Sequence, residues 1–413
     1  MRTPCYSDKP YLRAMRIHPI HARLAVLLFL HFFVLGSWLV TTGTYLLNTL
    51  DFTGNQVGLV YAGTAIGAMV SPFVSGLIAD RYLALDKFLA LLYGLGAVVM
   101  FFLAQAESFA WFYPLVLLYL VLYMPTMGLS TAMCFHHIER PNRQFPRVRA
   151  WGTLGWIIAG ILIGTLDLET QRIPLFIAAG SSLVLALYCL TLPHTPPSET
   201  AKQKSIGELI GLEAFGLLRK PAFAVLMLAL TLICIPSAFY YSFVNPYLNE
   251  IGVVNAAGKM AIGQVSEVVF MLTLPFFLSR FRLRYVMFIG LIAWGLRYLL
   301  FGYGQFEGQA WMLYVGILLH GIAFCFTALT GQIYVDQVAP RHLRSTAQGF
   351  VSFITLGFGA FFGSWFAGWI VEAHALPDNT HEWLPIWHWP SWIGIATGVL
   401  FLLLFRRKME QQA

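Results

Sequence analysis

The stretch AIGQVSEVVFMLTLPFFLSRF, residues 261–281, determines how the rest of the sequence is interpreted. It is long enough to cross a bilayer as a helix, which takes about 20 apolar residues. It nevertheless carries a carboxylate, Glu267, inside the apolar run. A charge at the bilayer centre costs roughly 3 kcal/mol even on forgiving scales, so such residues usually mark ion or proton pathways. Gln264, three residues earlier on the same helical face, completes a pair that suits a polar solute and a movable proton. The alternative is a packing role, in which the carboxyl is kept neutral or is bridged to a neighbouring helix.

Composition places the whole chain in a membrane. Of its 413 residues 58% are hydrophobic and 11% are charged, whereas soluble domains carry about 25% charged residues. The net charge of +7 does not indicate a nucleic-acid partner, because the basic residues flank apolar runs. The five cysteines show no CxxC spacing and lie mostly in apolar runs, which predicts neither a disulfide framework nor a metal site.

Twelve apolar stretches, each bounded by charged or turn residues, are predicted to be membrane-spanning helices. The fold class is therefore all-α, integral to the lipid bilayer and multi-pass. The predicted spans are residues 22–48, 57–79, 87–106, 109–135, 147–167, 173–193, 221–248, 258–280, 284–304, 308–337, 346–372 and 386–405.

The basic residues predict the orientation. The two ends of the chain and the loops after every second span hold 22 of the 26 lysines and arginines. Because such residues concentrate on the cytoplasmic side, both termini are expected to be cytoplasmic. Residues 1–21 and 406–413 are then cytoplasmic tails, and the first tail lacks the apolar core and cleavage site of a signal peptide.

The longest internal connection, residues 194–220, divides the chain into two six-helix halves, 22–193 and 221–405. It opens with prolines and becomes amphipathic over 206–218, which predicts a cytoplasmic linker with a surface helix.

An internal repeat supports this division. Ala79-Asp80-Arg81-Tyr82 resembles Leu278-Ser279-Arg280-Phe281, and Arg140-Pro141 resembles Ala339-Pro340 at the same offset. Duplicated halves that rock about a site near the membrane midplane are typical of transporters.

Several motifs resemble those of known transporters. Gly76-Leu77-Ile78-Ala79-Asp80-Arg81 looks like the loop motif of the major facilitator superfamily. More specifically, the chain resembles the nucleoside:proton symporter family over nearly its whole length. The matching segments are GSWL at 36–39, YMPT at 123–126, RAWGTLG at 149–155, QVSE at 264–267, LPFF at 274–277, YVD at 334–336 and AQG at 347–349.

This resemblance implies a secondary transporter, not an enzyme, that imports a small polar solute, a nucleoside, with protons. It implies no cofactor beyond the proton gradient, a monomer, and a bacterial-type inner membrane. Asp80 and Arg81 would latch the cytoplasmic gate. The residues that the family places at the nucleoside site are here Arg149, Thr153, Gln264 and Glu267.

The chain also departs from the family pattern around span 10. Cys325 follows Phe324 where members often have an aspartate, and His320 replaces a tyrosine found in some members. The polar pair of span 7 is replaced by the aromatic run 238–241. The alternative interpretation of the sequence is therefore a proton symporter for a sugar or another polyol.

Other polar and aromatic residues within spans are further candidates. His31 and His320 could carry protons, since histidine changes charge near neutral pH, or could be hydrogen-bonded core residues. Trp156 and Tyr241 offer stacking faces for a base or sugar. Arg149 lies close enough to a basic loop to be an ordinary anchor, and Arg297 is expected to snorkel or to pair with a helix-end carbonyl.

Other functional classes lack their signatures. The sequence contains no HExxH or GxSxG motif, no Walker A loop and no repeated filter residues. A sensor that has kept a transporter fold without turnover remains the non-transport alternative.

Overall fold

The computed structural model describes residues 19–74, 83–197, 207, 212–340 and 343–405, and every structural statement below concerns these residues. They form helices and no sheet; one isolated bridge joins Ala375 and His381. Eleven helices are long and apolar enough to cross a membrane, and each overlaps a predicted span. The remaining predicted span, 173–193, coincides with a shorter apolar helix of 17 residues.

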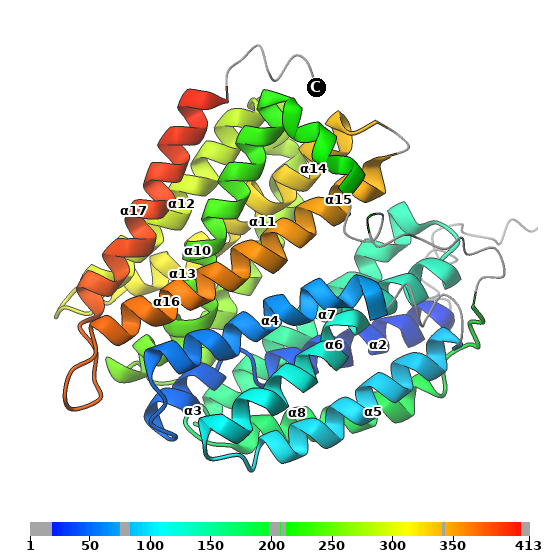
Figure 1. Cartoon of the computed structure of the whole chain (residues 1–413), viewed down its shortest axis with the longest axis horizontal. Coiled ribbons are helices and arrows are strands. Elements are labelled where there is room, and N and C mark those ends of the chain that lie inside the picture. The colour runs from blue at the N-terminus through cyan, green and yellow to red at the C-terminus, as the bar shows by residue number, and fades with distance from the viewer. Residues whose placement is uncertain (1–18, 75–82, 198–206, 208–211, 341–342, 406–413) are drawn as a thin grey trace, which may run out of the picture.

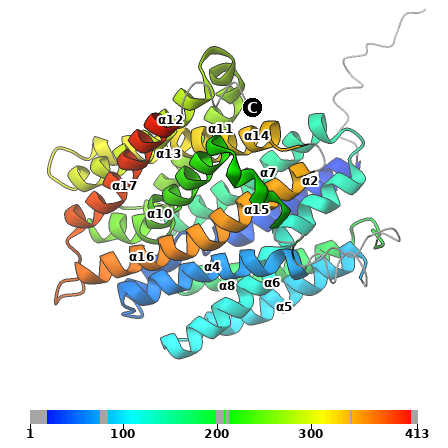
Figure 2. The same ribbon diagram turned by 45° about the horizontal axis from the view of Figure 1, so that its top comes forward.

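Two helical bundles make up the described chain (Figure 1). The first, blue to cyan-green, contains α2 to α8, and the second, green to red, contains α10 to α17. Helix α4 lies beside α16, and α7 lies beside α11, so the two bundles meet along these pairs (Figure 2). The helices of the first bundle are α2 (Pro19–Gly36), α3 (Thr42–Asn48), α4 (Gly54–Val74), α5 (Leu85–Leu103), α6 (Phe109–His137), α7 (Pro141–Thr165) and α8 (Ile173–Cys189). Those of the second are α10 (Pro221–Glu250), α11 (Ala256–Arg280), α12 (Leu283–Gly304), α13 (Trp311–Phe324), α14 (Thr330–Val338), α15 (Arg344–Ser352), α16 (Ala360–Ala373) and α17 (Trp383–Leu404).

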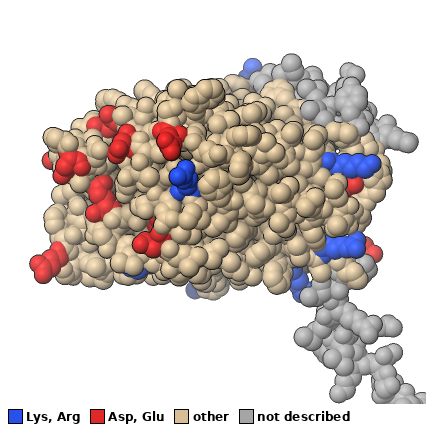
Figure 3. All heavy atoms as spheres, turned by 90° about the horizontal axis from the view of Figure 1, so that it is seen from below, with Lys and Arg blue, Asp and Glu red and all other residues tan. Residues whose placement is uncertain are grey.

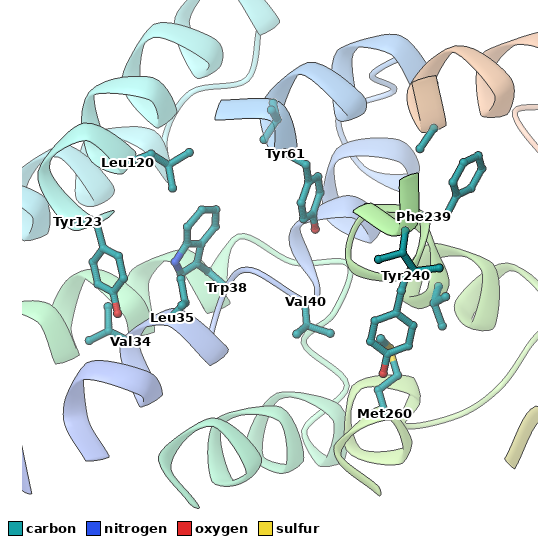
Figure 4. Close-up of a cluster of buried hydrophobic side chains, with 14 of the residues drawn as sticks. Val34, Leu35, Trp38, Val40, Tyr61, Leu120, Tyr123, Phe239, Tyr240 and Met260 are labelled. Carbon is teal, nitrogen blue, oxygen red and sulfur yellow. The ribbon is translucent and has the colours of Figure 1, made fainter. Parts of the chain in front are cut away.

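The prediction of one continuous first span over 22–48 is wrong. The helix ends at Gly36 and a new one begins at Thr42, with turns between them. The hydroxyl of Tyr61 on α4 donates to the Leu39 carbonyl at 2.6 Å and accepts from the Gly43 N–H at 3.1 Å. A break inside a membrane persists only where its backbone groups find such partners. Figure 4 shows Tyr61 above the interrupted segment.

The predicted spans 10 and 11 are each interrupted by a short π-helix. These are η3, Cys325–Leu329, between α13 and α14, and η5, Phe353–Gly359, between α15 and α16. Such local widenings of an α-helix occur frequently at functional sites. The first of them begins directly after Phe324, which the family resemblance suggests as a substrate-binding residue.

The connection between the bundles contains a 3-10 helix, η2 (Leu212–Arg219), where an amphipathic surface helix was expected over 206–218. Ala214 and Leu217 are buried, and the ring of Phe215 packs on Phe350 of α15 at a centroid distance of 5.0 Å. This 3-10 helix is therefore attached to the second bundle, whereas Thr195, at the start of the connection, bonds to Asp86 of the first bundle.

Charge is distributed unevenly along the long axis. Figure 3 shows acidic side chains grouped at one end and basic side chains at the other. The acidic end, defined here by the loops around Asp51, Glu107, Glu169, Glu307 and Asp378, is the one expected to face away from the cytoplasm.

The two bundles approach most tightly at this acidic end. A Cβ atom at Gly54 of α4 would lie 2.6 Å from the Glu372 nitrogen of α16, and one at Gly58 would lie 2.6 Å from the Ser364 carbonyl. Glycine thus allows α4 and α16 to touch backbone to backbone, as small residues do in membrane helix pairs. The structure is closed at the acidic end.

Candidate functional site

The Gln264–Glu267 pair of α11 faces His320 of α13. Glu267 Oε2 lies 3.6 Å from His320 Nε2, and the amide nitrogen of Gln264 lies 3.4 Å from the same ring nitrogen. His320 is fully buried, whereas the Glu267 side chain keeps 22% of its surface exposed. The carboxylate thus lies beside a buried histidine and keeps part of its own surface exposed, as a group that must gain and lose a proton requires.

Arg297 of α12 completes this cluster on the far side of His320. Its Nη1 donates to His320 Nδ1 at 3.0 Å, and its Nε donates to the Gly316 carbonyl at 3.2 Å. The guanidinium also lies 4.0 Å from the centre of the Tyr240 ring, a cation–π contact. Arg297 is fully buried, so the expectation that it snorkels is wrong. The carbonyl that it meets belongs to the middle of α13 and not to a helix end.

Aromatic rings surround the histidine. The Tyr240 ring stacks on His320 at 4.7 Å between centroids, Phe324 stacks on it at 6.1 Å, and Tyr241 meets it edge-on at 6.3 Å. Desolvation by these rings strengthens the polar contacts inside the cluster. Tyr240 was missed as a separate candidate, because a run of two tyrosines does not reveal which ring faces the site.

A cavity lies next to the cluster, between the two bundles. The cavity is small: only about 20 Å³ of it can be reached by the centre of a water molecule, which is room for about one water and far less than a bound small molecule needs. Trp156 and Tyr241, the predicted stacking faces, both line it, as does Gln264. Figure 4 shows Val40, in the interrupted segment of the first span, near Tyr240 and Met260. The remaining lining residues are Gly160, Ala257 and Ala261.

Helix α7 supplies the other predicted polar residues. The Arg149 guanidinium lies 4.1 Å from the centre of the Phe32 ring of α2, within the membrane bundle. It is half-buried, as is Thr153 one turn further on. Glu267 acts electrostatically on Arg149 across the interface between the bundles. The guanidinium therefore lies over a ring of the bundle interior, within electrostatic range of the site.

His31 lies apart from this site, inside the first bundle. Its Nδ1 is 2.7 Å from the Tyr93 hydroxyl, and its Nε2 is 2.8 Å from the Met127 sulfur. The Tyr123 hydroxyl donates to the His31 carbonyl at 2.6 Å. Both ring nitrogens have partners within one bundle, which is the arrangement of a hydrogen-bonded core histidine.

Cys325 occupies the place of the aspartate that the family pattern would supply. It is fully buried, and its thiol donates to the Glu267 carbonyl at 3.4 Å. The contact joins η3 to α11 beside the site, and it leaves Glu267 as the carboxylate of the cluster.

A second inter-bundle network, at the acidic end, was not predicted. Glu169, in the α7–α8 loop, accepts from the side-chain amides of Asn245 and Asn249 at 2.7 Å each and from the Ala257 N–H at 2.9 Å. Thr44 donates to Asn245 at 2.5 Å. Glu169 is 2% exposed. The sequence signal for this network was the pair Asn245 and Asn249, four residues apart at the end of α10. Their partner Glu169 is distant in sequence, so the contact could not be predicted.

The predicted gate residues and the possibility of a metal site complete the comparison with the sequence. The proposed gate residues Asp80 and Arg81 lie outside the described residues. Among the described residues, no group of three or more histidine, cysteine, aspartate or glutamate side chains is arranged to hold a metal ion.

Comparison with known proteins gives the family. The family model described as "Nucleoside H+ symporter" matches residues 18–410. The protein named "Putative nucleoside transporter YegT" of Escherichia coli K12 is 39% identical over 399 residues, 93% of each chain. The xanthosine permease of the same strain is 33% identical over 402 residues, covering 94% of this chain and 96% of the permease.

A solved structure agrees with these relatives. The crystal structure of the nucleoside transporter NupG matches with a TM-score of 0.87 at 30% identity, covering 94% of this chain and 100% of that one. A peptide-transporter-family structure, PepTSo, matches at 13% identity with a TM-score of 0.71, which indicates a shared fold alone. The expected family is confirmed: this chain belongs to the nucleoside H+ symporter family, with the major facilitator fold, and is a membrane transporter and not an enzyme.

Proposed function

We propose that this chain imports nucleosides across a bacterial inner membrane, each together with protons. The observation that carries the proposal is the partly exposed carboxylate of Glu267 at the buried His320, next to a small cavity between the bundles that has aromatic rings in its wall. Family membership supports the proton coupling, and the named activities of YegT, NupG and the xanthosine permease support the substrate class.

Each site residue has a proposed role. Glu267 carries the proton. Gln264, Arg149 and Thr153 supply hydrogen bonds to the solute, while Trp156, Tyr241 and Phe324 stack against its base or exclude water. His320 links Glu267 of α11 to Arg297 of α12, and its alternative role is that of the proton carrier. His31 is proposed as a core residue because its partners lie in one bundle.

The transport cycle follows from the position of Glu267 between the bundles. When the cavity faces outside, Glu267 binds a proton and the nucleoside enters, which removes the unpaired charge from the site. The bundles then rock, and the cavity opens to the cytoplasm, where the proton concentration is lower. Loss of the proton restores the carboxylate and releases the solute. Because an unpaired charge is costly in a low-dielectric site, movement of the solute depends on whether Glu267 carries a proton.

We propose further that twelve helices span the membrane, in halves 22–193 and 221–405 joined by the cytoplasmic linker 194–220. The uneven charge of the two ends supports cytoplasmic tails at 1–21 and 406–413 (Figure 3). We also propose that the transporter works as a monomer, with no cofactor beyond the proton gradient, and that Asp80 and Arg81 latch its cytoplasmic side.

An uptake panel tests this function. Cells lacking their own nucleoside carriers would express the chain and receive labelled purine nucleosides, pyrimidine nucleosides, xanthosine, sugars and polyols. We expect accumulation of at least one nucleoside, abolished by a protonophore. Accumulation of a sugar or polyol alone would replace the substrate class, and an absence of any uptake by correctly inserted protein would favour the sensor alternative.

A further inference from the structure

Arg297 places a permanent hydrogen-bond donor against one nitrogen of His320. The guanidinium stays protonated in proteins and has no acceptor atom. Its Nη1 lies 3.0 Å from His320 Nδ1, so this nitrogen must be the unprotonated acceptor. The ring proton of a neutral histidine then resides on Nε2, the nitrogen that faces Glu267 and Gln264.

A second proton on His320 is opposed by the same contact. It would have to occupy Nδ1, where it would face the Arg297 N–H instead of a lone pair. The ring is fully buried, so no water can take the place of the lost acceptor. Two cations would then lie in contact inside the membrane, an arrangement with a large cost. A proton that reaches the cluster is therefore held by Glu267, because His320 Nε2–H can only donate.

The tautomer also orients Gln264. With a hydrogen on His320 Nε2, the amide must present its oxygen there, because two donors cannot pair. Amide oxygen and nitrogen are exchanged by a simple flip, which changes no other contact of the cluster. The NH2 group of Gln264 is then left for the cavity that this residue lines.

Other groups near His320 and Glu267 do not offer the histidine a competing acceptor. The contacts on the ring are faces or edges of aromatic residues, and the Cys325 thiol donates to backbone. The titratable and charged groups that face the pair are Tyr240 and Tyr241 from α10, Arg297 from α12, Cys325 from η3 and, electrostatically, Arg149 from α7.

We propose that Arg297 is a positioning residue for proton coupling: it holds His320 as the Nε2–H tautomer, so that Glu267 and not His320 carries the transported proton. The proposal rests on the proposed proton-coupled function, and it assigns a role to the buried arginine of α12. It also explains how a fully buried histidine can lie beside the proton-binding carboxylate without competing with it.

Nitrogen-15 NMR of histidine-labelled protein in lipid nanodiscs tests the tautomer directly. The His320 signals are identified by their loss in His320→Gln. In the wild type we expect an unprotonated Nδ1 and a protonated Nε2 at both about pH 5.5 and about pH 7.5, on either side of the ordinary histidine value of about 6.5. In Arg297→Met we expect His320 to gain a second proton over that range. Arg284→Met is the matched control, because Arg284 lies on the same helix but donates to Leu402.

A wild-type His320 protonated on Nδ1, or an Arg297→Met spectrum identical to wild type, would overturn the proposal. This measurement involves no substrate, so it decides the role of Arg297 even if no nucleoside is transported. The pH profile of uptake is the second readout. The pH profile of Arg297→Met should show an additional inflection, from titration of His320, and the double variant Arg297→Met/His320→Gln should lack it. An equal loss of uptake at every pH would instead show that Arg297 has a purely structural role.

Discussion

Replacing Glu169 by glutamine should release the acidic end of the transporter from its closed state. Both carboxylate oxygens of Glu169 accept hydrogen bonds from the second bundle, at 2.7, 2.7 and 2.9 Å. One of the donors is the N–H of Ala257, the second residue of α11, where the helix dipole also favours a negative charge. Glutamine has one acceptor oxygen and turns an NH2 group toward these donors.

The size of the effect follows from these contacts. A hydrogen bond to a charged group contributes about 1.5–3 kcal/mol, and an anion at a helix N-terminus contributes about 0.3–1 kcal/mol. Losing one such bond together with the dipole term should destabilise the closed state by about 2–4 kcal/mol. At 1.4 kcal/mol for each factor of ten, the closed-to-open ratio falls about 30- to 700-fold. Because Glu169 is 2% exposed, solvent screening removes little of this difference.

Pulsed electron paramagnetic resonance can measure the change. Spin labels on Glu107→Cys and Glu307→Cys, in a background without the native cysteines, report the separation of the two bundles at the acidic end. Both positions are exposed loop residues. Glu169→Gln should add a population with a longer distance.

Asp167→Asn is the matched control for this experiment. Asp167 lies in the same loop, with φ near 53°, a conformation that asparagine also tolerates. The control should keep the wild-type distance. An unchanged distance in Glu169→Gln, or the same shift in both variants, would refute the assigned role of Glu169.

Three further predictions concern the transport site and the cytoplasmic gate. Glu267→Gln keeps shape and hydrogen bonding but cannot release a proton, so proton-driven accumulation should vanish while exchange of labelled for unlabelled solute persists; continued accumulation against a gradient would mean that another group carries the proton. Arg149→Lys should lose uptake as severely as Arg149→Ala, at least tenfold, because a point charge does not replace a planar fork of donors; normal uptake by the lysine variant would identify Arg149 as a simple anchor. Asp80→Asn should lower the maximal transport rate and leave the affinity for the solute within about twofold of the wild type. Measuring the maximal uptake rate in cells and solute binding to the purified protein would separate these two effects.

The membrane spans were largely predictable, because about 20 apolar residues are required to cross a bilayer whatever the fold. The break between Gly36 and Thr42 was not. Its sequence, SWLVT at 37–41, contains no proline or glycine, and Tyr61 from another helix binds the Leu39 carbonyl within it and the Gly43 N–H just after it. Tertiary contacts of this kind leave no periodic pattern in the sequence.

The candidate site was predictable to the extent that its residues lie on one helix. Gln264 and Glu267 share a face of α11 by their spacing alone, and the structure places both next to His320. The partner of His320 on its other side, Arg297, was instead expected to snorkel or to pair with a helix-end carbonyl. Its contact depends on how α12 packs against α13, which one sequence does not determine.

The contact of the short helix α3 with the second bundle affects how fast the transporter can reset between transport cycles. Gly43 of α3 is held to α4 through Tyr61, yet its Cα lies against the Ser242 carbonyl and Pro246 of α10, in the other bundle. At Gly43 this contact is made with backbone and a rigid proline ring, neither of which has a flexible side chain to reorder. It can therefore separate and rejoin with little loss of rotamer entropy. Fast, reversible resealing of the outer mouth would let the protein return empty without leaking protons.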